Sequence, residues 1–170
     1  MDLRKQIREV PDFPKPGILF YDITTLLRDS TGLSETIDRL SEPFTSKAID
    51  AVIGIESRGF ILGAPVAERL GVGFIPIRKP GKLPAKTLTQ NYDLEYGKDA
   101  LQIHADAVEE GQRVIIVDDV LATGGTAASA VALVKSIGGE LQGLAFLIEL
   151  RSLNGRTKLA GQRIHSVLNY

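Results

Sequence analysis

The residues best suited to chemistry are two adjacent aspartates, Asp118 and Asp119, which follow an unbroken β-branched run at 114–117. Such a run, with charged residues on both sides, is typical of a strand buried on both faces of a parallel sheet. Open α/β sheets bind their ligands at the carboxyl ends of such strands. The pattern therefore predicts that both carboxylates lie at a ligand site, although an aspartate pair taken alone is more often a polar turn that caps the next helix.

A glycine-rich segment follows the aspartates and leads into a helical pattern over 127–137. The segment consists of Ala122, Thr123, Gly124, Gly125 and Thr126. Adjacent glycines let the backbone turn tightly and direct several N–H groups at one phosphate. The positive end of the helix and the threonine hydroxyls would add to this attraction. Two carboxylates would repel a bare phosphate but can accept hydrogen bonds from sugar hydroxyls or hold a hydrated Mg²⁺. The order strand, aspartates, glycine turn and helix thus predicts a site for a phosphorylated ribose.

A second turn of the same kind, Glu56-Ser57-Arg58, lies between an apolar strand pattern at 51–55 and a helical pattern at 60–70. Two such units at one edge of a sheet form a shared cleft. Arg58 could be a solvated cation, but a cation at a helix start is disfavoured by the helix dipole. That misfit favours an anionic ligand.

Four cations follow the strand pattern at 73–77, namely Arg78, Lys79, Lys82 and Lys86, and no acid occurs before Asp93. Prolines and a glycine interrupt the segment. It could be a mobile surface loop or a flexible lid that closes over a polyphosphate. The two anion-binding turns favour a lid, and we expect a flexible loop over 79–96.

The N-terminal part is predicted to contain a short amphipathic helix over 2–10 and then a proline-rich stretch that forbids regular structure. The apolar segment at 18–21 should be extended, either as an arm over a pocket or as a strand packed on the core. A helix is expected over 30–47 with a break at Pro43. Strands are expected at 143–150 and 164–168, with a short helix between them.

The 170 residues are 44% hydrophobic and carry a net charge of −1. These values suit one domain over 1–170 with a sizeable core. The two units of strand, polar turn and helix predict an α/β fold with a central, mainly parallel sheet flanked by helices. The charge argues against nucleic-acid binding, and no apolar run is long enough to span a membrane. The absence of cysteine excludes disulfides and thiolate metal sites and suits a cytoplasmic protein. His104 and His165 lack metal-ligand spacing.

The segment VIIVDDVLATGGT at 114–126 resembles the PRPP-binding motif of the type I phosphoribosyltransferases, where PRPP is 5-phosphoribosyl-1-diphosphate. Segments at 12–24, 54–67, 77–84 and 92–97 resemble the members that use adenine, in the same order. The resemblance implies a cytoplasmic homodimer with an N-terminal hood (1–29) that holds the base. It implies transfer of the phosphoribosyl group from PRPP to adenine, giving AMP and pyrophosphate. Mg²⁺ would be held mainly by PRPP and water.

The resemblance also implies a role for each site residue. Glu95 would handle the purine ring proton, 122–126 would hold the 5′-phosphate, and Asp118 and Asp119 would hold the ribose. The pyrophosphate residues would be Glu56, Ser57, Arg58, Arg78, Lys79 and Lys82. A cis peptide is implied between Glu56 and Ser57, and Arg78 would reach into the neighbouring subunit.

The base would be held by the main chain of Leu19 and Tyr21 and by the ring of Phe20, with a side chain near 149–151 at its border. Tyr21 departs from the arginine that the family leads us to expect. A 6-oxopurine enzyme is an alternative, and it would need a donor such as a lysine after the last strands, where 148–158 offers Lys158. A PRPP-sensing regulator is a second alternative, but it would carry an added DNA-binding domain.

Overall fold

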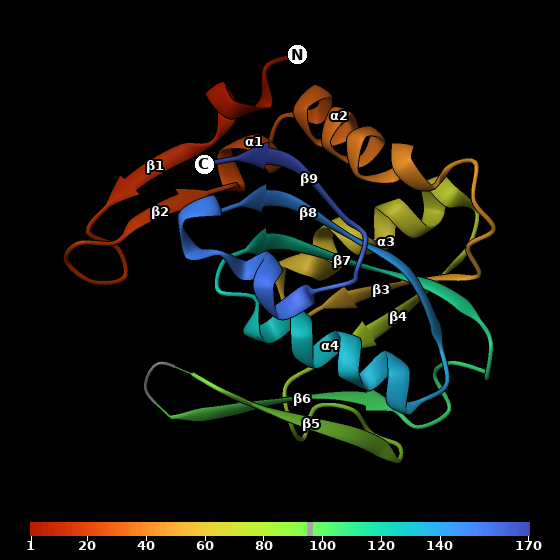
Figure 1. Ribbon diagram of the computed structural model, residues 1–170. Helices are drawn as coiled ribbons and strands as arrows, with labels where there is room; N and C mark the ends of the chain where they lie inside the picture. Colours follow the sequence, from red (N-terminus) through yellow and green to blue (C-terminus); the bar gives the residue numbers. More distant parts are fainter. Residues whose placement is uncertain (95–96) are drawn as a thin grey trace.

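A computed structural model describes residues 1–94 and 97–170 of the chain. Its centre is a five-stranded sheet in the order β4-β3-β7-β8-β9, in which every pairing is parallel (Figure 1). The strands are β3 (Ala51–Ile55), β4 (Gly73–Ile77), β7 (Arg113–Leu121), β8 (Glu140–Glu149) and β9 (Ile164–Asn169). The predicted parallel sheet is confirmed.

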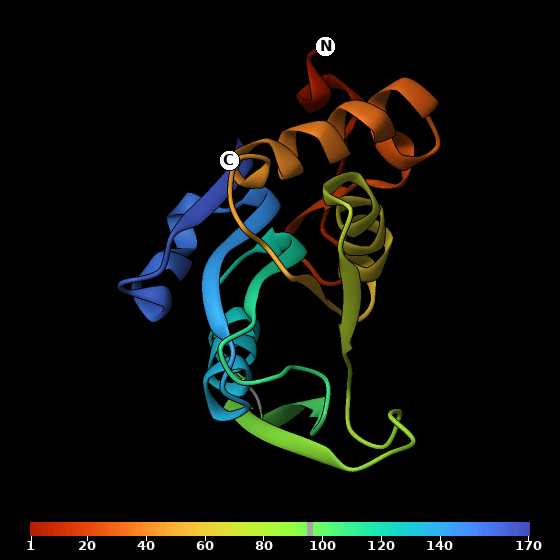
Figure 2. The same cartoon turned by 90° about the vertical axis from the view of Figure 1, so that its right-hand side faces the viewer.

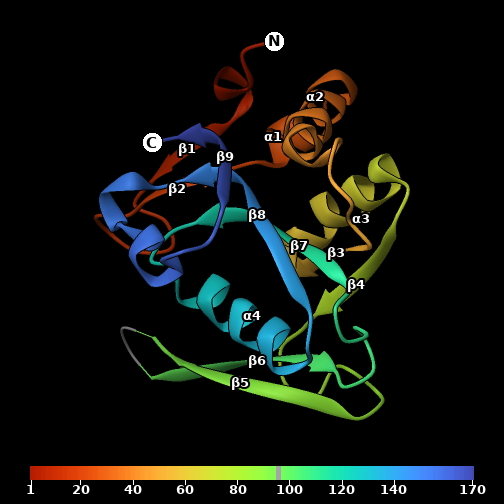
Figure 3. The same ribbon diagram turned by 45° about the vertical axis from the view of Figure 1, so that its right-hand side comes forward.

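The sheet is buried on both faces, as the apolar run in β7 predicted. Ile115 and Val117 belong to one hydrophobic cluster, whereas Val114 and Ile116 belong to the other. Successive side chains of a strand point to opposite faces, so each face requires its own cover. The helices α2 (Ser30–Ser41) and α3 (Arg58–Leu70) cover one face, and α4 (Gly125–Ser136) covers the other (Figures 1 and 3).

The ends of α2 and α3 follow from local chemistry. The carboxylate of Asp29 accepts a hydrogen bond from the Gly32 N–H at 2.6 Å, which caps the start of α2. The helix ends at Ser41 and a 3₁₀ turn takes over at Glu42–Phe44. The predicted break at Pro43 is therefore confirmed, although no helix continues to residue 47. Helix α3 ends at Leu70, and the following Gly71 has the left-handed backbone (φ 70°) that favours glycine.

The strand order creates a switch point between β3 and β7. After β3 the chain moves outward to the edge strand β4, and it later returns to place β7 on the other side of β3. The loops that leave β3 and β7 therefore run to opposite faces of the sheet. In open α/β sheets the ligand-binding crevice lies at the carboxyl ends of two such strands.

The N-terminal hood differs from the predicted helix over 2–10. A 3₁₀ turn at Leu3–Gln6 is followed by strand β1 (Arg8–Pro11), which pairs antiparallel with β2 (Leu19–Asp22). Leu3 and Ile7 have helical spacing and are both buried. They do not lie on one helix, however, because the 3₁₀ turn ends between them, so each side chain enters the core separately. Short helix α1 (Thr24–Leu27) then joins the hood to α2.

Two paired strands at 87–93 and 98–104 overlap the range 79–96, where we expected a flexible loop. Strands β5 (Thr87–Asp93) and β6 (Lys98–His104) pair antiparallel and lie against α4, beyond the central sheet (Figures 1 and 2). Leu101 and Ile103 are fully buried and share a hydrophobic cluster with α4. This burial explains why much of the segment has regular structure. Whether it opens as a lid stays a prediction.

No helix among the described residues is long and apolar enough to cross a membrane.

Candidate active site

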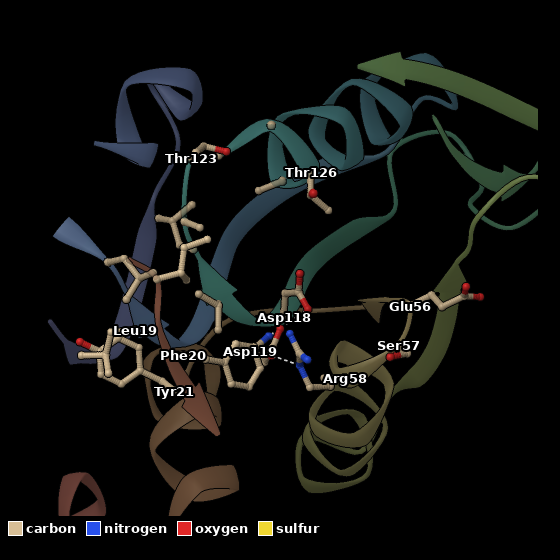
Figure 4. A pocket seen from close by; sticks show the side chains of 18 of the residues that line it. Leu19, Phe20, Tyr21, Glu56, Ser57, Arg58, Asp118, Asp119, Thr123 and Thr126 are labelled. Carbon is tan, nitrogen blue, oxygen red and sulfur yellow. Dashed lines mark hydrogen bonds and ion pairs between the residues drawn. The ribbon is translucent and has the colours of Figure 1, made fainter. Parts of the chain in front are cut away.

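A cavity of about 500 Å³ lies at the switch point between β3 and β7 (Figure 4). Its walls come from the hood strand β2, the turns after β3 and β7, and the start of α4. The lining comprises residues 18–21, 56–58 and 118–127, together with Lys79 and Leu150. Segments far apart in the sequence that were predicted to bind base, ribose, phosphate and pyrophosphate thus surround one space.

Two of the predicted site residues lie elsewhere, and a third is not among the described residues. Arg78 and Lys82 do not line the cavity, and Glu95 lies outside the described residues. Residues that we did not predict complete the wall, namely Ile18, Val120, Leu121 and Ala127. Leu150 also lines it, and our expectation that a side chain near 149–151 borders the base stays a prediction. The binding roles themselves stay predictions.

The two aspartates lie within β7 rather than after it. The strand continues to Leu121 because β8 pairs with it as far as Glu149. Asp118 accepts a hydrogen bond from the Asp119 N–H at 2.9 Å. Burial, and then the neighbouring Asp119 carboxylate, raise the pKa of Asp118 well above its usual value. A cation or a hydrogen-bond donor on a ligand would favour the charged form of Asp118.

Arg58 connects three parts of the site. Its Nε donates to the carboxylate of Asp119, which is only 6% exposed (Figure 4). Its guanidinium also lies 5.7 Å from the ring centre of Phe20 in the hood. The start of α3 approaches β7 so closely that a Cβ on Gly59 would lie 2.8 Å from the Asp118 carboxylate. The unfavourable cation at the helix start is thus compensated by Asp119.

Glu56 holds the two cations that lie outside the cavity. Its carboxylate accepts from Arg78 Nε at 2.6 Å and pairs with Lys82 Nζ at 3.2 Å. Burial alone would raise the pKa of Glu56, but the two cations hold it below its usual value. The peptide bond between Glu56 and Ser57 is cis, as the family resemblance implied.

Lys79 lines the cavity and is held by the β5–β6 hairpin. Its Nζ pairs with the carboxylate of Asp99 and donates to the Tyr92 hydroxyl at 3.0 Å. Burial would lower the pKa of Lys79, but these partners raise it above its usual value, so the side chain stays charged. We missed Asp99 and Tyr92, because no local pattern shows that the hairpin returns to Lys79.

The glycine turn depends on close backbone packing. Gly124 has the left-handed conformation (φ 88°) and immediately precedes α4. A Cβ at Gly124 would overlap the carbonyl oxygen of Gly155, and a Cβ at Gly155 would lie 2.5 Å from that of Ala122. Two glycines therefore bring the segment at 155–159 directly against the turn. Gly155 was missed because its partner is distant in the sequence.

The C-terminal residue supports the hood at Tyr21. The rings of Tyr21 and Tyr170 lie 4.1 Å apart, and the guanidinium of Arg4 lies 4.2 Å from the Tyr170 ring centre. An arginine at position 21 would bring a second cation to the ring that Arg4 already contacts. The tyrosine thus fits a C-terminal contact that we did not predict.

A buried acid anchors the segment after β8. Glu149 is 5% exposed, and its two carboxylate oxygens accept from Arg156 Nε and Nη2, each at 2.7 Å. Ser166 also donates to it at 2.6 Å. Hydrogen bonds from Arg156, and further ones from Ser166, lower the pKa of Glu149 although burial opposes them.

We expect acid to remove the stability that Glu149 provides. A lowered folded-state pKa means that the contribution is complete above the ordinary glutamate pKa and is lost as the pH falls through the folded value. Glu149→Gln should lower the free energy of unfolding at neutral pH by about 2 kcal/mol. Urea unfolding of both proteins across the acid range measures the difference, which should shrink as the pH falls. A constant difference would contradict the pairing.

The phosphoribosyl transferase domain family matches residues 20–160. The adenine phosphoribosyltransferase of Cyanothece sp. is 59% identical over 170 residues, which covers all of both chains. That of Koribacter versatilis is 58% identical over 168 residues, covering 99% of this chain and 92% of the relative.

Two solved structures extend the agreement to the fold. The adenine phosphoribosyltransferase of Thermoanaerobacter pseudethanolicus matches with a TM-score of 0.97 at 52% identity, covering 99% of this chain and 98% of that one. The Saccharomyces cerevisiae enzyme, crystallised with adenine and an imino-altritol bisphosphate, matches with a TM-score of 0.93 at 40% identity, covering 98% and 97%. The chain accordingly belongs to the type I phosphoribosyltransferase family, among its adenine phosphoribosyltransferases.

Proposed function

We infer that the chain is a purine salvage enzyme that transfers the 5-phosphoribosyl group of PRPP to adenine, giving AMP and pyrophosphate. One observation carries this inference: a single cavity is lined by the aspartates of β7, by the glycine turn that follows β7 and by residues 18–21, where we propose that the base binds. The yeast relative that shares this fold was crystallised with adenine. A 6-oxopurine enzyme has no such support here.

Each wall of the cavity has a proposed partner on the substrates. Residues 122–126 bind the 5′-phosphate through backbone N–H groups and threonine hydroxyls. Asp118 and Asp119 accept hydrogen bonds from the ribose hydroxyls. The main chain at Leu19 and Tyr21 pairs with the adenine edge, and Phe20 packs against the ring.

The pyrophosphate group would replace acidic side chains of the protein as the partner of several cations. Arg58 is held by Asp119, Lys79 by Asp99, and Arg78 and Lys82 both by Glu56. A polyphosphate in the cavity would offer Arg58 and Lys79, which line it, a stronger anion than one carboxylate. Arg78 and Lys82 lie outside the cavity and would have to leave Glu56 to reach it. Catalysis then consists of positioning and of stabilising the departing negative charge.

The reaction replaces one bond at C1 of the ribose by another. The bond from C1 to the pyrophosphate oxygen breaks, C1 passes through an oxocarbenium-like state, and the adenine N9 bonds to C1. The N9 proton must leave, and we propose Glu95 as its acceptor, by family resemblance. A lid over 79–96 would exclude water and so prevent hydrolysis of PRPP.

The site suits a Mg²⁺ ion that is held mostly by substrate. Within the described ranges, no group of three or more His, Cys, Asp or Glu side chains is placed to hold a metal. Small hard cations commonly keep several waters and bind one or two carboxylates together with substrate phosphates. Asp118 and Asp119 at the cavity wall would contact such an ion through its water ligands, while PRPP and water hold it. When bound, the ion would neutralise charge on the departing pyrophosphate.

The assembly and the location stay predictions. Arg78 bonds to Glu56 of its own chain, so the expected reach into a neighbouring subunit would need that pair to open. We propose a homodimer in the cytoplasm, and light scattering of the purified protein measures the assembly.

Base selectivity tests the function directly. The protein is incubated with PRPP and Mg²⁺ and with adenine, hypoxanthine, guanine or no base, and the nucleotides are separated by chromatography. We expect AMP with adenine and at most traces of the other nucleotides, because a site that pairs with an amino group leaves polar groups unpaired against an oxo group. IMP or GMP formed at a comparable rate would contradict adenine specificity.

A further inference from the structure

The phosphate-binding turn lacks a cation of its own. Residues 118–127 include two aspartates and no lysine or arginine. A phosphate monoester carries about −1.5 to −2 charges at neutral pH. Backbone N–H groups and a helix dipole supply only partial positive charge. A lysine from another element would balance the site.

Lys158 lies beside this turn. Its Nζ is 4.0 Å from the position that a Cβ on Gly125 would occupy, and Gly125 is the first residue of α4. The backbone around Lys158 is held in place on both sides. Gly155 packs against Ala122 and Gly124, Leu159 is 2% exposed in the cluster beneath α4, and Arg156 is bonded to Glu149.

Lys158 differs from the cations assigned to pyrophosphate. Those cations, Arg58, Lys79, Arg78 and Lys82, each pair with a carboxylate. Within residues 1–94 and 97–170, no carboxylate lies at ion-pair distance from Lys158, and its side chain is exposed. A phosphate on the glycine turn would therefore gain this cation without breaking an ion pair between described residues.

We propose that Lys158 binds the 5′-phosphate of PRPP and of AMP from the Gly125 side of the turn. The proposal rests on the proposed function of residues 122–126. It also gives Lys158 a different task from the O6 donor that a 6-oxopurine enzyme would need. The 5′-phosphate does not change charge during the reaction, so Lys158 stabilises substrate and transition state equally. Such uniform binding lowers KM and leaves kcat nearly unchanged.

Lys158→Gln tests the proposal, with Lys135→Gln as the matched control in the last turn of α4. One charged hydrogen bond corresponds to about a tenfold effect or more. We expect Lys158→Gln to raise the KM for PRPP and the Kd for AMP by about 10-fold, with kcat and the KM for adenine within about 2-fold. Lys158→Arg should recover most of the affinity, and Lys135→Gln should behave as the wild type does.

Binding of AMP, adenosine and pyrophosphate, each measured by calorimetry, separates the possible outcomes. A phosphate contact predicts weaker AMP binding and unchanged adenosine and pyrophosphate binding. Unchanged AMP affinity in Lys158→Gln would overturn the proposal, as would an equal loss for adenosine, which would indicate a base contact or damage to the cavity. If instead the wild-type protein forms no AMP from adenine, the proposed function fails, whereas the AMP titration still tests Lys158.

Discussion

Changing Asp118 and Asp119 together to asparagine should lower kcat/KM for PRPP by about 10³-fold or more. Each carboxylate is proposed to accept a charge-assisted hydrogen bond from the ribose, and such bonds contribute about 1.5–3 kcal/mol each. Asp119 also holds Arg58 in the cavity. Steady-state kinetics with varied PRPP, together with calorimetric titration of PRPP, measure the loss.

The fold should survive this double substitution. Burial already disfavours the charged form of Asp118, so removing that charge costs little stability. The side chain of Arg58 is 47% exposed and can be solvated once Asp119 is neutral. Asp50→Asn is the control, because Asp50 pairs with Arg113 at the opposite end of β7. Its kcat/KM should match that of the wild type. Undiminished turnover in the double variant would contradict the ribose role.

The sequence predicts those parts of the site whose position follows from the common direction of the parallel strands. The apolar runs at 51–55 and 114–117 indicate buried strands and the run at 73–77 a short strand, and the structure has strands at all three. The polar turns after two of them must then meet at one edge of the sheet, because parallel strands all end on the same side. The order of the strands and turns along the chain was therefore enough to place the Glu56–Arg58 turn beside Asp118 and the glycine turn.

The contacts that the sequence does not predict are made with distant partner residues, which the hydrophobic periodicity of a segment does not reveal. Val10 reads as a helical position, but it pairs with Phe20 across a hairpin. Lys79 reads as a lid cation, yet Asp99 holds it from β6. Tyr170 supports Tyr21 from the far end of the chain. Each of these contacts joins side chains whose proximity is decided by tertiary packing.

The second large effect is expected from Gly124→Ala. The left-handed backbone (φ 88°) costs an alanine about 1–2 kcal/mol, and its Cβ would overlap the carbonyl oxygen of Gly155. Either the glycine turn or the segment at 155–159 must then move. A misplacement of about 1 Å at a binding site can cost on the order of 10²-fold in rate. We therefore expect kcat/KM for PRPP to fall at least about 100-fold.

Gly111→Ala separates backbone strain from the collision with Gly155. Gly111 has nearly the same conformation (φ 82°), but a Cβ there would meet nothing within 4 Å. It should lose about 1 kcal/mol in the free energy of unfolding and keep full activity, whereas Gly124→Ala loses more stability and most activity. Equal losses in both variants would mean that close packing of residues 124 and 155 does not shape the phosphate site. If Gly124→Ala loses more stability and activity than Gly111→Ala but still binds AMP normally, the damage lies in the fold and not in the glycine turn. AMP titration of both variants distinguishes these cases.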